Sequence, residues 1–542
     1  MENRALLAFA ISLAILIGYQ YLFPPPEPVP APAPVAAQQA VQPSAGDAVA
    51  PPPVPAASAQ APAALSAPDP ADEKVAGVTT SLYDAELTSF GGRLRSFLLS
   101  EHRAGAGRDA PPLDMVASES LLPLGVTWVD AAGNVADDRA VEYALVEEHA
   151  RLGDGETHSI RLEGRTDDGV EIRKTVEFVD GSYLIGLDVE VVGNAGPVGV
   201  QWVRAVDPDA GGYYNIEGPA LFADGELEAI SAADLEAPES YTGAQVSWAG
   251  YADHYFLAAF VPEAAAPLRL VAAATPLLGQ ATVWNDAAAG RVRYQVFVGP
   301  KSIHLLDSIG HDLGAAIDLG IFAIIARPLL EVLFLIERVT HNFGWAIIAL
   351  TLLIRLVFYP INNKQMEAMK AMQRIQPEVK KVQDRYKDDR EKLNKEMMEL
   401  YRRHKVNPLS GCLPMVVQIP VFIGLYNVLM QAIELRHAPF FGWISDLSQP
   451  DRLGSLPIPF VDPPGIPVMT LLMGASMFLQ QKMTPTTADP QQQRIMMLMP
   501  LIFTVMFVNF ASGLVLYWFA NNVFQIVQQY LNNRAAPAPA KA

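Results

Sequence analysis

The stretch GWAIIALTLLIRLVFY, residues Gly344–Tyr359, decides how this chain of 542 residues folds. It is uncharged except for Arg355, and its composition is typical of a membrane-spanning helix. A charged side chain at mid-bilayer costs about 2.5–3.5 kcal/mol on insertion scales, so it normally faces protein or a water-filled cavity rather than lipid. Arg355 therefore predicts a polar recess inside a membrane domain.

Five further apolar runs accompany this stretch, and together they predict six membrane spans. The fourth and fifth runs would be only about 24 Å long as helices, against a hydrocarbon core of about 30 Å, so we expect them to thin the bilayer locally. The six runs are residues 6–23, 344–359, 411–433, 466–481, 495–510 and 513–530.

Charge is distributed as unevenly as hydropathy. Residues 24–343 carry 18 Lys and Arg against 44 Asp and Glu, whereas residues 355–405 carry 14 against 8. Because basic residues collect on cytoplasmic loops, we expect residues 362–410 inside the cell and the acidic segment outside. Both termini then lie in the cytoplasm, residues 434–465 form an outer loop, and residues 531–542 form a short cytoplasmic tail.

The region before the acidic segment divides into two parts. Residues 1–23 are predicted to be an uncleaved transmembrane anchor, because their apolar run exceeds the usual h-region of a signal peptide; a cleaved signal peptide is the alternative. Residues 24–74 consist mainly of Pro, Ala, Val, Gln and Ser, a composition that cannot bury a core. We expect these residues to be a disordered linker.

Residues 75–305 alternate between apolar and polar positions, with turn signals between the runs. The clearest case is Glu171–Val179, which is followed by Asp180-Gly181 and then by Tyr183–Val191. This pattern predicts a β-hairpin, and its repetition predicts a large antiparallel sandwich. Further strands are predicted at residues 82–87, 281–284 and 291–298.

Two amphipathic segments flank the second span. Residues 316–343 are apolar but contain several charges and Pro328, which predicts an interfacial helix that lies on the outer surface of the membrane crossed by the spans. Residues 362–410 carry two apolar stripes at helical spacing, which predicts a helical hairpin turning near residues 387–389. Its methionines suit varied apolar partners, or they simply fill the seam of the hairpin. They are Met366, Met369, Met372, Met397 and Met398.

Polar side chains within the spans form the candidate site. Thr351 lies one helical turn before Arg355 and shares its face. If amides from other spans converge on this face, they would line a hydrated recess that opens toward the cytoplasm. Alternatively, Arg355 extends to the inner interface and the amides tie helices together. The other polar side chains are Gln418, Asn427, Gln431, Thr504, Asn509, Asn521, Asn522 and Gln525.

The sequence lacks the motifs of several enzyme classes. No GxSxG, HExxH or Walker A motif occurs, and no histidine lies within a predicted span. We therefore predict no catalytic residue, no metal and no cofactor.

The C-terminal part resembles the YidC/Oxa/Alb family of membrane protein insertases, and the whole layout is similar to its Gram-negative members. Together with Arg355, the motifs cover roughly residues 344–530. They are KVNPLSGCLP (405–414), QIPVF (418–422), WISDLS (443–448), QQKMTPTT (480–487) and SGLVLYW (512–518).

This resemblance implies an α-helical polytopic membrane protein with a five-helix insertase core and a periplasmic all-β supersandwich. It also implies a cytoplasm-facing hydrophilic groove that binds substrate. In this chain Arg355 and Thr351 match the groove, and Tyr517 with Trp518 match an aromatic contact region. The predicted substrate-binding set is completed by Gln418 and Asn521.

The implied function is insertion and folding of inner-membrane proteins, alone or with the Sec translocon. The expected partners are nascent inner-membrane proteins, the Sec translocon, the ribosome, the signal recognition machinery and the lipid bilayer, with no recognition of nucleic acid sequence. The tail lacks a long basic extension that could reach a ribosome. The rival hypotheses are a secondary transporter or channel for a small anion, and a periplasmic binding protein whose spans only anchor it.

Overall fold

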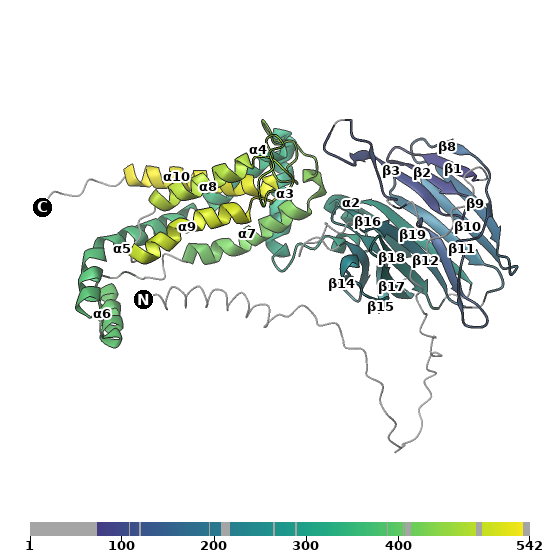
Figure 1. Cartoon of the computed structure of the whole chain (residues 1–542), viewed down its shortest axis with the longest axis horizontal. Coiled ribbons are helices and arrows are strands. Elements are labelled where there is room, and N and C mark those ends of the chain that lie inside the picture. Colours follow the sequence, from purple (N-terminus) through teal and green to yellow (C-terminus); the bar gives the residue numbers. More distant parts are fainter. Residues whose placement is uncertain are drawn as a thin grey trace, which may run out of the picture.

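The structure is a computed structural model, and it describes residues 73–534 except for short stretches. The predicted anchor and nearly all of the predicted linker lie outside the described residues, as does the chain beyond residue 534. Figure 1 shows a β domain at one end of a group of helices, with α6 (Arg390–Arg403) toward the other end. The stretches left out are residues 108, 117, 119–120, 195, 207–216, 264–265, 288–289, 387–388, 405, 407–412 and 484–489.

The β domain contains two sheets within the described residues. The smaller sheet has the order β4-β3-β2-β1-β8, and the larger has the order β6-β5-β12-β18-β17-β15-β16-β19-β11-β10-β9-β7, with β13 and β14 added beside β15. The smaller sheet comprises β1 (Val75–Thr79), β2 (Tyr83–Thr88), β3 (Leu94–Arg103), β4 (Pro112–Asp114) and β8 (His149–Arg151). The larger comprises β5 (Gly125–Val129), β6 (Val135–Asp137), β7 (Tyr143–Ala144), β9 (Thr157–Arg165), β10 (Glu171–Val179), β11 (Leu184–Val191), β12 (Val198–Ala205), β13 (Gly218–Ala223), β14 (Glu226–Ala229), β15 (Glu239–Ala252), β16 (Phe256–Pro262), β17 (Ala266–Ala274), β18 (Leu278–Asn285) and β19 (Arg291–Pro300).

The predicted hairpin is confirmed by β10 and β11, which pair antiparallel with Ile172 opposite Val191. Buried and exposed positions alternate along β10 because successive side chains point to opposite faces of a sheet. The other predicted strands lie within or largely within β2, β18 and β19. Residues from both sheets share one hydrophobic core, so the sandwich prediction holds.

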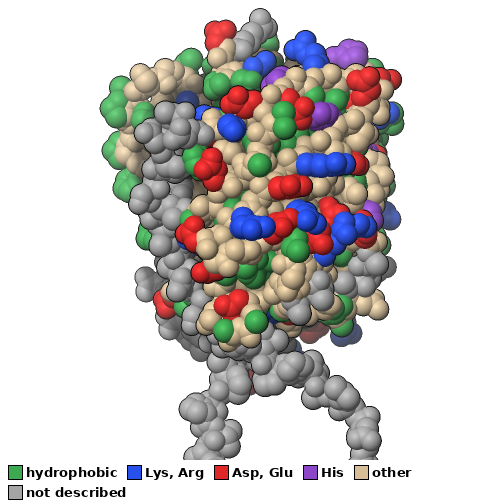
Figure 2. All heavy atoms as spheres, turned by 90° about the vertical axis from the view of Figure 1, so that its right-hand side faces the viewer, with side chains coloured by type: hydrophobic (Ala, Val, Ile, Leu, Met, Phe, Trp, Pro, Cys, Tyr) green, Lys and Arg blue, Asp and Glu red, His purple; other side chains and the backbone are tan. Residues whose placement is uncertain are grey.

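The outer face of the larger sheet is exposed to solvent and carries mixed charge. Asp188 on β11 pairs with Arg291 and Arg293 on β19, and Arg173 on β10 pairs with Glu190 on β11. Figure 2 views the molecule from the side of the β domain and shows acidic and basic side chains interspersed across its surface. Opposite charges on neighbouring strands support the sheet pairing weakly and keep this face soluble.

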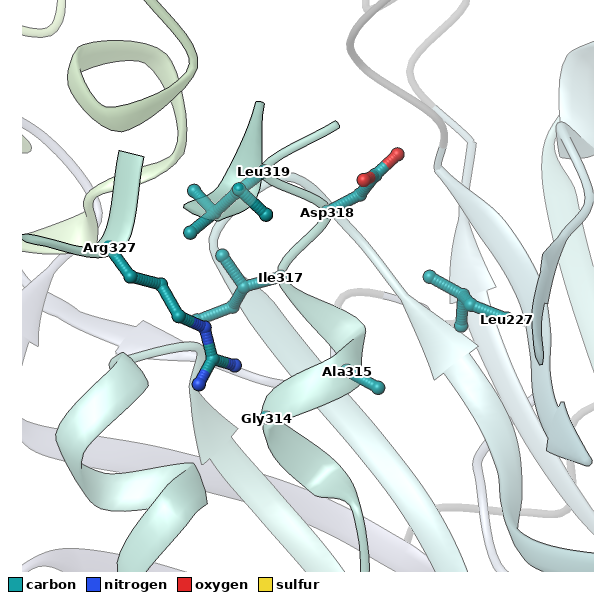
Figure 3. Close-up of a pocket in the computed structure, with 8 residues that line it drawn as sticks. Leu227, Gly314, Ala315, Ile317, Asp318, Leu319 and Arg327 are labelled. Atoms are coloured by element: carbon teal, nitrogen blue, oxygen red, sulfur yellow. The ribbon is translucent and has the colours of Figure 1, made fainter. Parts of the chain in front are cut away.

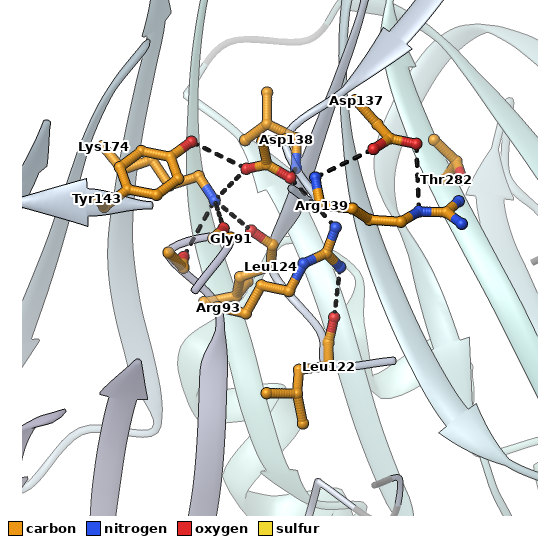
Figure 4. Close-up of polar contacts among 12 residues, drawn as sticks. Gly91, Arg93, Leu122, Leu124, Asp137, Asp138, Arg139, Tyr143, Lys174 and Thr282 are labelled. Atoms are coloured by element: carbon orange, nitrogen blue, oxygen red, sulfur yellow. Dashed lines mark hydrogen bonds and ion pairs between the residues drawn. The ribbon is translucent and has the colours of Figure 1, made fainter. Parts of the chain in front are cut away.

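A cluster of charged side chains is buried in the β domain (Figure 4). The Asp138 carboxylate lies 3.1 Å from Arg93 Nη2 and 2.6 Å from Lys174 Nζ, and it accepts a hydrogen bond from the Tyr143 hydroxyl. Lys174 also donates to backbone carbonyls, including that of Leu124. The side chains of Asp138 and Lys174 are fully buried, so each charge depends on the other. The cluster joins the two sheets.

The helices form a separate region after the β domain. Here α10 packs against α4 and α8, α3 packs against α4 and α7, and α9 packs against α8. The described helices are α2 (Ile303–Ile309), α3 (Ala323–Thr340), α4 (Phe343–Val357), α5 (Tyr359–Arg385), α6, α7 (Leu413–Gln431), α8 (Val468–Met483), α9 (Pro490–Met506) and α10 (Ser512–Arg534).

The predicted second span, residues 344–361, is not one straight helix. The chain bends by 61° between α4 and α5, and this bent pair is long and apolar enough to cross a membrane by composition. No single helix among the described residues meets that test. Pro360 explains the break, because proline lacks an N–H and clashes with the preceding helical turn.

The predicted helical hairpin is confirmed for α5 and α6. Its seam contains the buried side chains of Ile375, Val379 and Leu400, with Met372 and Met397 packed against them. The predicted turn lies partly outside the described residues. The segment predicted as an interfacial helix forms α3, which begins at Ala323 rather than at residue 316. A short 3-10 turn, η3 (Leu313–Ala316), and the non-helical residues 317–322 precede it.

The β domain contacts the C-terminal end of α7 and the segment that follows it. His254 bonds the carbonyl of Met430 (2.7 Å), and Ser302 donates to the Glu434 carboxylate (2.8 Å). Arg436 donates to a β3 carbonyl, and its guanidinium lies 5.4 Å from the ring centre of Phe256. These contacts tie the two regions together.

Candidate functional site

Arg355 lies in the last turn of α4 and reaches across to α10. Its Nε donates to the side-chain oxygen of Asn521 (2.8 Å), and its Nη2 donates to the Asn521 backbone oxygen (3.1 Å) and to Oε1 of Gln525 (2.8 Å). Asn521 and Gln525 are four residues apart, so they share one face of α10. One edge of the guanidinium is therefore held by three oxygen atoms.

Tyr517 and Gln418 extend this cluster to a third helix. Tyr517 lies one turn before Asn521 on α10 and is only 2% exposed. Its side chain hydrogen-bonds Gln418 of α7 and lies close enough to Arg355 to interact with its charge. The structure thus brings together four of the six predicted site residues, Arg355, Asn521, Tyr517 and Gln418, and adds Gln525. We call these five residues the arginine cluster.

The arginine cluster contains one formal charge. The hydrogen-bond partners of Arg355 are neutral amide and backbone oxygens, and no carboxylate in the described part of the chain pairs with it. Neutral dipoles orient a guanidinium and partly replace its hydration, but they do not cancel its charge. The cluster can therefore attract an anionic group.

Thr351 and Trp518 do not join the arginine cluster. The Thr351 side chain is 1% exposed, and its hydroxyl donates to the carbonyl of Ile347 one turn earlier (2.6 Å). Trp518 packs among aromatic rings, with centroid distances of 4.7 Å to Phe422 and 4.5 Å to Phe507. Both side chains therefore have internal partners in this structure.

Several of the other polar side chains tie elements together, as the alternative interpretation expects for them. Asn427 donates to the carbonyl of Leu319, and Asn522 donates to the Ser476 hydroxyl. Thr504 donates to the carbonyl one turn before it, and Asn509 bonds the loop before α8. Asn427, Asn509 and Asn522 are therefore structural ties between elements, whereas the Thr504 hydroxyl bonds within its own helix.

A second row of contacts, which was not predicted from the sequence, continues along α10. Gln528 and Asn532 both donate to Asn363 Oδ1 on α5 (3.1 and 3.0 Å), and Lys370 donates to the Asn532 carbonyl (3.1 Å). With Asn521 and Gln525, these amides recur at spacings of four, three and four residues. That helical spacing was the available signal, and it extends the polar stripe toward the base of the hairpin.

The predicted methionine contacts differ in their surroundings. Met372 and Met397 fill the hairpin seam, and the Met366 sulfur accepts a hydrogen bond from Asn532. Met398 is 61% exposed, whereas nothing is described of the Met369 side chain. Of the described methionines, Met398 is the one that presents most of its side chain to the surroundings.

A separate cavity of about 310 Å³ lies where β14 and η3 meet the start of α3 (Figure 3). Arg327 extends toward Gly314 and Ala315, while the Asp318 carboxylate points away from it. Arg327 pairs instead with Asp307 at 3.8 Å, and both of those side chains are about half exposed. The polar groups of this cavity do not converge as those around Arg355 do.

Two family models together match nearly all of the described chain. The model described as the YidC periplasmic domain matches residues 76–332, and the model described as the 60Kd inner membrane protein matches residues 335–539. The chain belongs to the YidC family. It is accordingly an inner membrane protein with a periplasmic β domain and a helical C-terminal region.

Curated relatives are similar to the chain over almost their whole length. A protein of Pelobacter propionicus named membrane protein insertase YidC is 39% identical and covers 98% of this chain and 99% of its own. A protein of Syntrophus aciditrophicus with the same name is 37% identical, covering 99% and 100%. A solved structure titled as an active YidC insertase is 19% identical and covers 83% of this chain and 91% of its own, with a TM-score of 0.37.

Proposed function

We propose that this chain is a membrane protein insertase and chaperone that inserts and helps fold inner-membrane proteins. In this proposal it acts alone or with the Sec translocon, through a hydrophilic groove that faces the cytoplasm. Full-length relatives that carry the insertase name support the proposal. The observation that carries it is the arginine cluster, in which a cation among apolar helices is oriented by neutral groups alone.

Arg355 would receive an acidic group from the substrate segment that crosses the membrane. The hydrogen bonds described for Arg355 use Nε and Nη2, so Nη1 is the donor that an incoming carboxylate would meet. A charge-assisted hydrogen bond there is stronger than a neutral one. The substrate carboxylate would thus exchange part of its hydration for Arg355 before it moves outward.

No covalent chemistry and no nucleotide are needed for this mechanism. Partitioning of the substrate helix into lipid supplies about 0.3–0.6 kcal/mol for each central Leu, Ile, Phe or Val. A membrane potential adds about 2.3 kcal/mol per charge and 100 mV for acidic groups that move outward. One charge at mid-bilayer costs about 2.5–3.5 kcal/mol on insertion scales, so several apolar residues together with the potential can offset it.

The remaining predicted contacts have narrower roles in the proposal. Tyr517 and Trp518 would contact the apolar helix of the substrate, and Thr351 would do so once its hydroxyl leaves the Ile347 carbonyl. The exposed Met398 would receive the substrate at the hairpin before it reaches the arginine cluster. The Sec translocon, the ribosome and the signal recognition machinery are proposed partners at the membrane and cytoplasmic faces.

Reconstitution of the purified chain in phospholipid vesicles tests the proposal. We expect insertion of a single-span substrate with an acidic translocated segment, without nucleotide and above the level of protein-free vesicles. A variant lacking residues 75–300 should retain insertion. Loss of insertion with a correctly folded helical region would instead favour the periplasmic binding protein, and chloride or phosphate flux without insertion would favour the anion transporter.

A further inference from the structure

The loop between α7 and α8 presents an apolar segment to the surroundings. Between Arg452 and Asp462 the sequence LGSLPIPFV contains no charged residue. Three of its side chains are widely exposed, Leu453 at 47%, Leu456 at 56% and Phe460 at 88%. Exposed apolar residues that cluster in this way mark an interaction surface, whereas isolated ones do not.

Phe460 has an unusual backbone for the most exposed of these residues. Its φ of 66° lies in the left-handed region, which a residue with a bulky side chain rarely adopts. Asn509 fixes this conformation, because its amide donates to the Phe460 carbonyl (3.1 Å) and its oxygen accepts from the Asp462 N–H (3.1 Å). Such a conformation persists only where the surroundings hold it in place.

Arg452 makes the base of this loop rigid. Its Nε donates to the Pro463 carbonyl (2.6 Å), and Nη2 donates to the Asp462 carbonyl (2.7 Å) and to Asn509 (2.9 Å). Its Nη1 donates to the carbonyls of Asp451 and Val508. All five guanidinium N–H groups are engaged, so the loop is shaped before it meets any partner.

These bonds place the loop beside the turn that joins α9 to α10. Val508 and Asn509 belong to that turn, and the last residues of α9 expose Val505 (60%) and Met506 (50%). The apolar loop therefore continues the exposed apolar surface of α9. Family membership puts the chain in a membrane, so the same lipid that covers α9 is the fitting occupant for the loop.

We propose that residues 453–461 insert into the outer leaflet of the bilayer, with Phe460 as the tip. An aromatic side chain is suited to the membrane interface, where Trp and Tyr are also enriched. The clamp by Arg452 and Asn509 would hold the tip at a fixed position relative to α9 and α10. The loop would thus anchor the outer end of these helices.

Fluorescent labelling of the full-length chain in phospholipid vesicles tests this proposal. In a Cys412→Ala background, Phe460→Cys would carry an environment-sensitive nitrobenzoxadiazole label. Leu277→Cys is the matched control, because Leu277 is 76% exposed on a turn of the β domain. We expect blue-shifted emission at position 460, and quenching by doxyl-labelled lipid about twofold or more above that at position 277.

Equal emission and equal quenching at the two positions would overturn the proposal. Shielding of position 460 only after other membrane proteins are added would also overturn it, in favour of a protein partner. A second pair of proteins carries the label at position 456, so that the effect of Phe460 can be measured without labelling position 460. Leu456→Cys is labelled with Phe460 present or replaced by glycine, which accepts the left-handed backbone. Quenching should fall in the glycine variant, and unchanged quenching would remove Phe460 as the tip.

Discussion

Lys174 in the β domain is buried and Arg355 in the helical region is partly buried, and their partners differ. Lys174 meets the Asp138 carboxylate at 2.6 Å, and Arg93, the Tyr143 hydroxyl and the Val126 N–H also bond that carboxylate (Figure 4). Arg355 meets only neutral oxygens on α10. A cation that is paired with a carboxylate in the same protein stabilises the fold. A cation whose partners are all neutral keeps an uncompensated charge, which can bind an anionic ligand.

The largest expected effect is on stability in the β domain. Replacing Lys174 with methionine leaves Asp138 buried with less positive charge around it, so we expect a loss of about 3–5 kcal/mol in the free energy of unfolding. Arg173→Met is the matched control, because Arg173 is the preceding residue of β10 and 48% exposed. Chemical denaturation of the detergent-solubilised chain measures the free energy of unfolding of both variants. Equal losses would show that the buried Lys174–Asp138 pair matters no more for stability than an exposed ion pair.

Asn521→Asp would convert the arginine cluster into a pair like that of the β domain. A carboxylate beside Arg355 should leave stability unchanged or higher, and should lower insertion of substrates with acidic segments about tenfold, or about 1.4 kcal/mol. Gln528→Glu makes the same kind of change two turns further along α10, where it contacts Asn363. A comparable defect in that control would contradict the role assigned to position 521.

Removing the charge of Arg355 should cost far less stability than removing that of Lys174. In Arg355→Gln no buried carboxylate is left unpaired, so we expect a change of about 1 kcal/mol in the free energy of unfolding. Thermal unfolding in detergent, compared with Arg355→Lys, measures the difference. A loss as large as that of Lys174→Met would mean that Arg355 is a structural residue.

The smallest effect is expected at the contact between the two regions. Burial lowers the pKa of His254, whose Nε2 donates to the Met430 carbonyl while Nδ1 is buried without a partner. The fold therefore favours the neutral imidazole, and its contribution to stability is present above the ordinary histidine pKa of 6.5. As the pH falls below 6.5, the unfolded state takes up a proton first and this contribution is lost.

Hydrogen exchange of residues 430–436 between pH 7 and pH 5, corrected for the intrinsic exchange rate, measures this loss. His254→Gln is the control, since its amide can still donate to the carbonyl but does not titrate. Burial also lowers the pKa of His102, so the relevant quantity is the difference between the wild type and His254→Gln. Equal pH dependence in the two proteins would exclude His254 as its source.

The parts of the fold that follow from local periodicity were predictable from the sequence. The hairpin of β10 and β11 follows from two-residue alternation, and the seam of α5 and α6 follows from helical spacing. The bend before α5 was missed because the apolar run continues to Tyr359, although Pro360 was its signal.

The arginine cluster was predictable only in part. Asn521 and Gln525 share a face of one helix, so their meeting with a common partner was within reach of the sequence. Asn427 and Asn509 have the same chemistry, but they bond loops, because tertiary packing decides which amide meets which partner. The internal bond of Thr351 reflects the tendency of hydroxyls in helices to bond the preceding turn.

The most direct test of the unpaired charge of Arg355 is a double-mutant cycle between this residue and the substrate. Insertion into vesicles would be measured for the wild type and Arg355→Gln, each with a substrate whose translocated segment carries Asp or Asn. We predict that the preference for the Asp substrate disappears in Arg355→Gln, with a coupling of about 1.4 kcal/mol, or about tenfold in rate. Additive effects of the two changes would contradict the account.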